Sequence, residues 1–118
     1  MGEYDMKTDV TLVTITEEMV QHYETIFGKQ NRLPPTFPMI FYRFINIPWD
    51  YKSAPIHRKQ TCVCTKELSI GETYRCVVTL DQETPKEKYT FYTQSLIGYN
   101  LEGSECFRCV SELVVRLP

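Results

Sequence analysis

Apolar residues recur at helical spacing in the segment after Thr16. These residues are Met19, Val20, Tyr23, Ile26 and Phe27, and polar residues separate them. Thr16 offers a hydroxyl suited to a helix N-cap, and Glu17 and Glu18 would place acids at the positive end of the helix dipole. Gly28 is typical of a helix C-terminus. The pattern predicts an amphipathic helix that lies on an apolar surface. Before it, residues 10–15 alternate apolar residues with threonine and predict a short strand.

A second apolar segment predicts a buried helix. Residues 33–38 contain three prolines and are excluded from a helix, because proline lacks a backbone donor and restricts the residue before it. Residues 39–47 then read MIFYRFINI, which is apolar almost all round. Such a helix must be buried on most sides, and Pro48 ends it. A strand is the alternative, but the segment lacks strict alternation.

From Lys59 onward the alternation of apolar and polar residues predicts strands. One predicted strand carries Tyr74, Cys76, Val78 and Leu80 on one face, and the last carries Phe107, Cys109, Ser111, Leu113, Val115 and Leu117. Residues 89–100 form an aromatic, threonine-rich segment between them. Turn-forming residues occupy 69–72, 81–88 and 101–104. Four consecutive strands with short connections predict an antiparallel meander.

This order of elements predicts one α+β domain over residues 1–118, in which the sheet curls around the buried helix. That arrangement is the hot-dog fold, and one copy of it leaves an exposed sheet edge that pairs with a second copy. The length of 118 residues is that of a single domain. A net charge of −2 indicates no nucleic-acid partner, and no apolar run is long enough to span a membrane. The chain start is no signal peptide, so we expect a cytoplasmic protein.

The five cysteines are expected to be thiols that pack as small hydrophobic residues. Cys62 and Cys64 are two residues apart and should share a strand face, whereas Cys106 and Cys109 should face opposite ways. A tetrahedral metal site needs four ligands that converge. We therefore predict no metal and no cofactor.

Five motifs together resemble the N-terminal domain of MaoC-like hydroxyacyl-thioester dehydratases and hydratases. They are ITEEMVQHYETIFG at 15–28, PPTFP at 34–38, HRKQ at 57–60, LSIGE at 68–72 and VVR at 114–116. The resemblance covers nearly the whole chain. It implies a hot-dog fold, a dimer, and binding of acyl-CoA or acyl-carrier-protein thioesters.

The chain departs from this family at the catalytic motif. Active members carry G-D-x-N-P-x-H after the first helix, and its Asp and His act as the acid–base pair. Here the corresponding segment is GKQNRLP at 28–34. Lys29 occupies the place of the Asp, Pro34 occupies that of the His, and among the polar residues of the motif Asn31 alone matches. We therefore do not expect this chain to catalyse the family's reaction through the residues at these two positions.

The remaining candidate residues follow from the resemblance and from charge. His57 matches the family's H-x-x-Q and is the candidate catalytic residue, with a structural histidine as the alternative. Substrate-binding candidates are Asn31, Arg32, Phe37, His57 and Arg58, and the two arginines, with Lys29 and Lys59, offer cations for phosphates. His22 is expected on the surface.

The sequence leaves several functions open. The first is a non-catalytic subunit that binds acyl thioesters, either as a homodimer or beside a hot-dog partner that supplies Asp and His. The second is an active hydratase or dehydratase that uses other residues, with His57 as the first candidate catalytic residue. A thioesterase is the third, although residues 39–47 contain no carboxylate. A stand-alone acyl-CoA sensor is the fourth.

Overall fold

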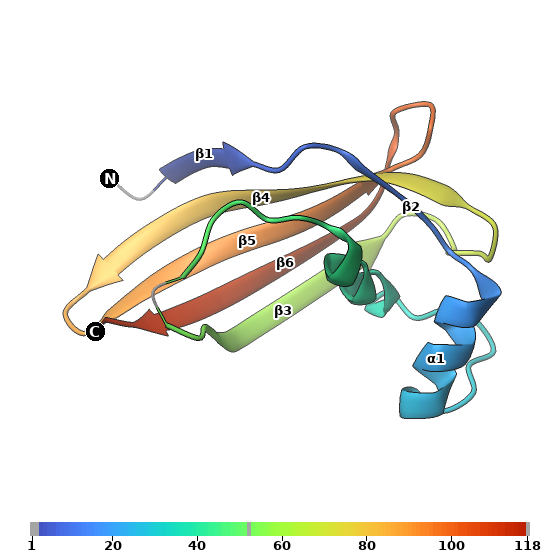
Figure 1. The fold of residues 1–118 in the computed structure, drawn as a ribbon, viewed down its shortest axis with the longest axis horizontal. Helices are drawn as coiled ribbons and strands as arrows, with labels where there is room; N and C mark the ends of the chain where they lie inside the picture. Colours follow the sequence, from blue (N-terminus) through green and yellow to red (C-terminus); the bar gives the residue numbers. More distant parts are fainter. Residues whose placement is uncertain (1–2, 52, 118) are drawn as a thin grey trace.

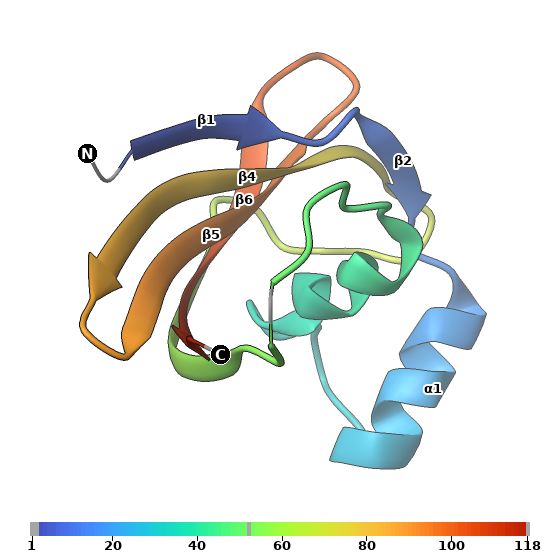
Figure 2. The ribbon, with the colours of Figure 1, turned by 60° about the vertical axis from the view of Figure 1, so that its left-hand side comes forward.

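Strands make up most of the fold. A computed structural model describes residues 3–51 and 53–117. Within them lie six strands, β1 (Glu3–Lys7), β2 (Thr11–Thr14), β3 (Ile56–Cys64), β4 (Thr73–Lys86), β5 (Tyr89–Tyr99) and β6 (Glu105–Arg116). They form one antiparallel sheet in which β4, β5, β6 and β3 follow in that order, and β1 and β2 both pair with β4. The sheet curls around the 3-10 helix η1 (Phe37–Phe44), and helix α1 (Glu17–Phe27) lies beside it (Figures 1 and 2).

The first predicted helix and the strand before it are confirmed. The Thr16 hydroxyl accepts a hydrogen bond from the Met19 N–H at 3.2 Å and so caps α1. At the other end Gly28 has a φ of 86°, and its N–H donates to the Glu24 carbonyl at 2.8 Å. Glycine suits this position because a side chain would disfavour a positive φ.

The buried helix exists, but its predicted bounds of 39–47 are wrong. It is a 3-10 helix that begins at Phe37 and ends at Phe44, and Phe37, Pro38 and Phe41 are buried. Ile45 is already extended, with φ −108° and ψ 126°. The segment beyond it crosses toward β5, where Trp49 Nε1 donates to the Gln94 amide oxygen at 3.1 Å. The apolar run thus continues past the helix as an extended segment that contacts β5.

The predicted order of the last four strands is also wrong. Only β4, β5 and β6 form a meander, and β3 pairs with β6 at the sheet edge. The predicted turn at 81–88 is mostly strand, because β4 continues to Lys86 past an irregularity in register between Leu80 and Gln82. This end of the hairpin extends beyond the core, so its two faces can be polar.

Cys106 and Cys109 are both buried in the same core, contrary to the expectation that they face opposite ways. The pairing of β5 with β6 shifts register between Gly98 and Tyr99, beside Cys106. A shift of one residue in a strand turns a side chain to the other face.

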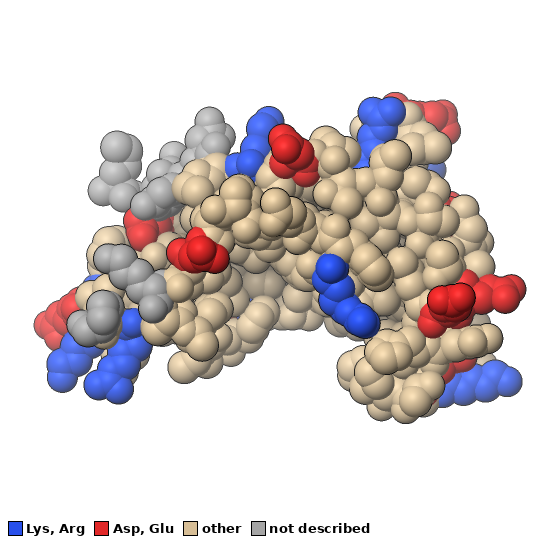
Figure 3. Space-filling model, in the orientation of Figure 1, with Lys and Arg blue, Asp and Glu red and all other residues tan. Residues whose placement is uncertain are grey.

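No helix among the described residues is long and apolar enough to cross a membrane. Charged side chains are scattered over the face seen in Figure 3.

Aromatic side chains join the helices to the sheet. The Phe41 ring lies 6.0 Å from Phe37 and 5.6 Å from Phe107, both in edge-to-face geometry. Tyr23 of α1 meets Phe37 at 5.1 Å, and Tyr74 of β4 meets Phe107 at 5.3 Å. These contacts form one continuous cluster from α1 through η1 to the concave face of the sheet.

We predict that Gly98→Ala destabilises the protein by about 1–3 kcal/mol. A Cβ atom at this position would overlap the ring of Phe107, which lies directly opposite on β6. Urea denaturation measures the change, with Thr93→Ala on the same strand as the control. The cost should be smaller in a Phe107→Leu background, because the smaller side chain leaves room for the methyl group. Equal costs in both backgrounds would contradict this explanation.

Candidate functional site

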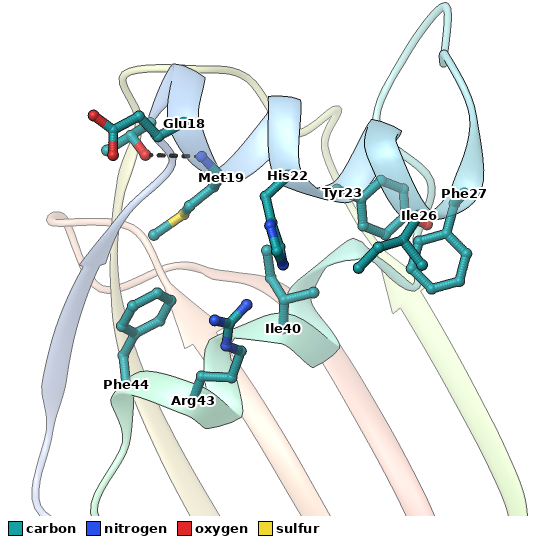
Figure 4. Close-up of a pocket in the computed structure, with 10 residues that line it drawn as sticks. Glu18, Met19, His22, Tyr23, Ile26, Phe27, Ile40, Arg43 and Phe44 are labelled. Atoms are coloured by element: carbon teal, nitrogen blue, oxygen red, sulfur yellow. Dashed lines mark hydrogen bonds between the residues drawn. The ribbon is translucent and has the colours of Figure 1, made fainter.

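A groove of about 550 Å³ lies between α1 and η1. Apolar side chains form most of its walls, namely Met19, Tyr23, Ile26, Phe27, Ile40 and Phe44 (Figure 4). Thr16, Glu18, His22 and Arg43 contribute polar groups. Binding sites for small molecules have this character, with apolar walls and a few polar groups.

The groove exists because α1 has more apolar surface than the core covers. Tyr23 is the residue of α1 that is buried. Ile26 and Phe27 belong to the same apolar stripe, yet they remain 62% and 61% exposed. Phe44 on the opposite wall is 48% exposed. The two helices thus face each other across an apolar gap that neither closes.

The polar groups of the groove do not form an acid–base pair. His22 and Arg43 point toward one another, while Glu18 points away from both (Figure 4). Salt bridges within 4.0 Å among the described residues join Arg58 to Glu112 and Arg108 to Glu105, and none involves Glu18. A carboxylate and an imidazole must lie within hydrogen-bond reach of the same proton or water to act together.

The residues predicted to bind substrate lie in three separate places. Asn31 and Arg32 line a smaller hollow of about 220 Å³ beside Glu67, Leu68 and Ile70. Phe37 is buried in the aromatic cluster. His57 and Arg58 are exposed on β3, the edge strand.

His57 and Arg58 have different surroundings on β3. His57 lies across from the buried Leu113 of β6. Arg58 falls at the irregularity of the β3–β6 pairing, where it approaches Glu112 at 4.0 Å and lies 5.3 Å from the centre of the Phe91 ring. A contact of this kind between a cation and an aromatic face is weakly stabilising at an exposed site.

A polar cluster near the centre of the sheet is built from neutral groups. The Gln94 amide oxygen accepts hydrogen bonds from Trp49 and from Tyr51, the latter at 2.7 Å. Its amide nitrogen donates to the Tyr42 hydroxyl at 3.3 Å. Burial raises the pKa of Tyr42 to about 12, so this phenol stays protonated near neutral pH. The cluster fixes the segment after η1 and offers no ready general base.

Two buried thiols, those of Cys76 and Cys109, are also poor nucleophiles. Cys62 and Cys109 face each other across β3 and β6. Burial raises the pKa of the Cys109 thiol, with the neighbouring Cys62 adding to the effect, and burial raises that of Cys76 to about 12. A protonated thiol is neither a good nucleophile nor a metal ligand.

The sequence could have indicated the groove only in part. The apolar stripe of α1 contains Ile26 and Phe27, and His22 is exposed as expected. Arg43 and Phe44 stood inside the predicted buried helix. Their exposure depends on where η1 ends and on how α1 approaches it, and neither follows from local spacing.

We predict that the outer groove wall can be made polar with little effect on stability. The double variant Ile26→Gln/Phe27→Gln should unfold within about 1 kcal/mol of the unchanged protein, because both side chains are exposed. Tyr23→Ala should cost about 3 kcal/mol, because this ring is buried against Phe37. Urea denaturation measures both. The double variant should also bind less of a dye such as 1-anilinonaphthalene-8-sulfonate, and an unchanged dye signal would contradict an accessible apolar groove.

No family model and no curated protein matches the sequence. Solved structures with a similar fold are found. A chain of the HadBC (3R-hydroxyacyl-ACP dehydratase) complex from Mycobacterium tuberculosis has a TM-score of 0.74 at 11% identity, over 97% of this chain and 98% of that one. A chain of the ChsH1–ChsH2 complex from the same organism has a TM-score of 0.73 at 8% identity, over 95% and 89%.

The MaoC-like dehydratase from Rhodospirillum rubrum has a TM-score of 0.71 at 14% identity, with 97% of this chain and 93% of that one covered. These likenesses show the fold. The α+β hot-dog fold expected from the sequence is confirmed, and so is the resemblance to MaoC-like dehydratases at the level of the fold. The chain is a hot-dog domain with the architecture seen in these dehydratases.

Proposed function

We propose that this chain binds acyl thioesters as a non-catalytic hot-dog subunit and pairs with a second hot-dog chain. The observation that carries the proposal is the apolar groove beside the central helix, whose polar residues include no paired acid and base. An acyl chain would lie along the groove walls, and the thioester would be acyl-CoA or an acyl-carrier-protein conjugate.

The loop that would hold the catalytic pair supports a non-catalytic role. In the MaoC-like pattern an Asp and a His follow the first helix, where this chain has Lys29 and Pro34. Lys29 is exposed, and the neighbouring Gln30 N–H is bonded to the Glu24 carboxylate at 3.1 Å. Neither side chain supplies the carboxylate or the imidazole that the MaoC-like pattern uses as its acid–base pair. A partner subunit would therefore supply the chemistry.

The free edge of β3 supports pairing with a second chain. Along β3 the described residues pair with β6 on one side only. Ile56 and Val63 on this strand are 66% and 57% exposed. An open strand edge with exposed apolar side chains favours pairing with another strand. HadBC and ChsH1–ChsH2 are complexes by name, which agrees with a partner-completed subunit.

The purified chain should not hydrate crotonyl-CoA but should be stabilised by acyl-CoA. A ligand at one hundred times its Kd stabilises the folded state by about 2.7 kcal/mol, which a thermal-shift series of acyl-CoAs detects. Absorbance at the enoyl-thioester band follows hydration, and release of free CoA thiol follows hydrolysis. Clear turnover in either assay would overturn the non-catalytic role. His57→Ala then decides whether that activity depends on His57.

A charged β3 edge should prevent pairing. We predict that Ile56→Lys/Val63→Lys is monomeric in sedimentation at concentrations where the unchanged chain is dimeric, because like charges would meet across the joined strands. Val10→Lys/Leu12→Lys is the matched control, since those apolar residues are equally exposed near the opposite edge of the sheet. Dissociation of the control variant but not of the β3 variant would contradict the proposal, because it would show that the dimer contact lies at the edge opposite to β3.

A further inference from the structure

Arg43 places a cation at the wall of the groove. It lies near the end of η1, between the apolar residues Ile40 and Phe44. Two other arginines have carboxylate partners, Arg58 with Glu112 and Arg108 with Glu105. Among the described residues, no hydrogen bond or ion pair holds the Arg43 guanidinium. A guanidinium carries five N–H donors, so this one can still bind an anion.

The direction of the side chain favours a ligand over a structural role. A cation in the last turn of a helix can interact with the helix dipole, and Arg43 occupies such a position in η1. However, the guanidinium extends across the groove toward His22 of α1 (Figure 4). The two nitrogen-bearing side chains therefore face the same space. Glu18, the carboxylate of the groove, points away from them.

We propose that the groove binds a single apolar chain that carries an anionic head group, and that Arg43 binds the anion with His22 as a neighbouring donor. This inference rests on the proposed function, because both place an acyl chain in the same groove. The anion is the carboxylate of a free fatty acid or a phosphate of the thioester carrier. Either one makes a charge-assisted hydrogen bond with a guanidinium.

The size of the groove fits such a ligand. Decanoate needs about 360 Å³ if each heavy atom takes about 30 Å³, the share of a water molecule in the liquid. The groove offers about 550 Å³. The exposed Ile26, Phe27 and Phe44 would lose contact with water when the chain binds, and burial of apolar area drives this binding.

Calorimetric titration of four ligands tests the proposal. Decanoate and decanoyl-CoA carry anions, whereas decanol and S-decanoyl-N-acetylcysteamine are neutral. Arg43→Gln should weaken the binding of one or both anionic ligands about tenfold or more, the usual effect of a hydrogen bond to a charged group. It should leave both neutral ligands within about twofold. Arg43→Lys should restore part of the loss, because it keeps the charge.

Arg75→Gln is the matched control, since Arg75 is also exposed but lies on β4, away from the groove lining. It should change the binding of none of the four ligands. Thermal unfolding of Arg43→Gln should match that of the unchanged protein, so that a loss of binding is not a loss of folding. A loss with decanoate identifies a carboxylate as the anion, and a loss with decanoyl-CoA alone identifies a phosphate.

Unchanged anion binding in Arg43→Gln would overturn the inference, as would an equal loss for the neutral ligands. The proposed function stands in both cases if S-decanoyl-N-acetylcysteamine still binds. Conversely, binding of decanoate that depends on Arg43, together with no binding of either thioester, supports the inference and overturns the proposed function. If none of the four ligands binds, both are wrong.

Discussion

The packing of Phe41 against the concave face of the sheet is the contact on which the rest of this fold depends. Phe41 meets Phe107 of β6 on one side and Phe37 of the same short helix on the other. Phe37 in turn holds Tyr23, the buried residue of α1. Burial of each ring contributes a few kcal/mol. The edge-to-face geometry of these pairs adds about 0.5–1.5 kcal/mol each. The curled sheet, η1 and α1 are thus connected through one row of rings, which passes beside Gly98 because that position has no side chain.

The groove results from the limited contact between α1 and the core. Tyr23 is buried and Met19 and Val20 pack partly against the core, whereas Ile26 and Phe27 near the end of α1 remain 62% and 61% exposed. The segment from Gly28 to Thr36 is short and contains two adjacent prolines, so it cannot fold back as a further helix over the gap. Apolar surface of this kind is costly in water, and a ligand that covers it recovers the cost.

Local periodicity predicted the elements of this fold better than their arrangement. The Thr16 cap, the stripe of α1 and the alternation in β4 and β6 depend on neighbours within a few residues, and all are found. The pairing of β3 with β6 joins residues about fifty positions apart, and the alternation of β3 would suit either neighbour. The extended segment after η1 contacts β5 through the hydrogen bond from Trp49 to Gln94, and Cys106 lies at a register shift between β5 and β6; neither feature is local in the sequence. The candidate site was predicted least well from the sequence. The exposure of Arg43 and Phe44 is determined by how α1 and η1 lie relative to each other, which local spacing does not give.

The free edge of β3 and the groove call for different occupants, which is why pairing and ligand binding should be separable. A strand edge presents a row of backbone donors and acceptors with a fixed spacing, and another strand matches it residue by residue. The groove presents side chains instead, apolar walls with a guanidinium, an imidazole, a carboxylate and a hydroxyl. A polypeptide strand would leave its own backbone groups unsatisfied against such walls. A flexible chain with a single charged end has no such groups to satisfy. From the chemistry of each surface we therefore expect a protein partner at β3 and a small amphiphile in the groove.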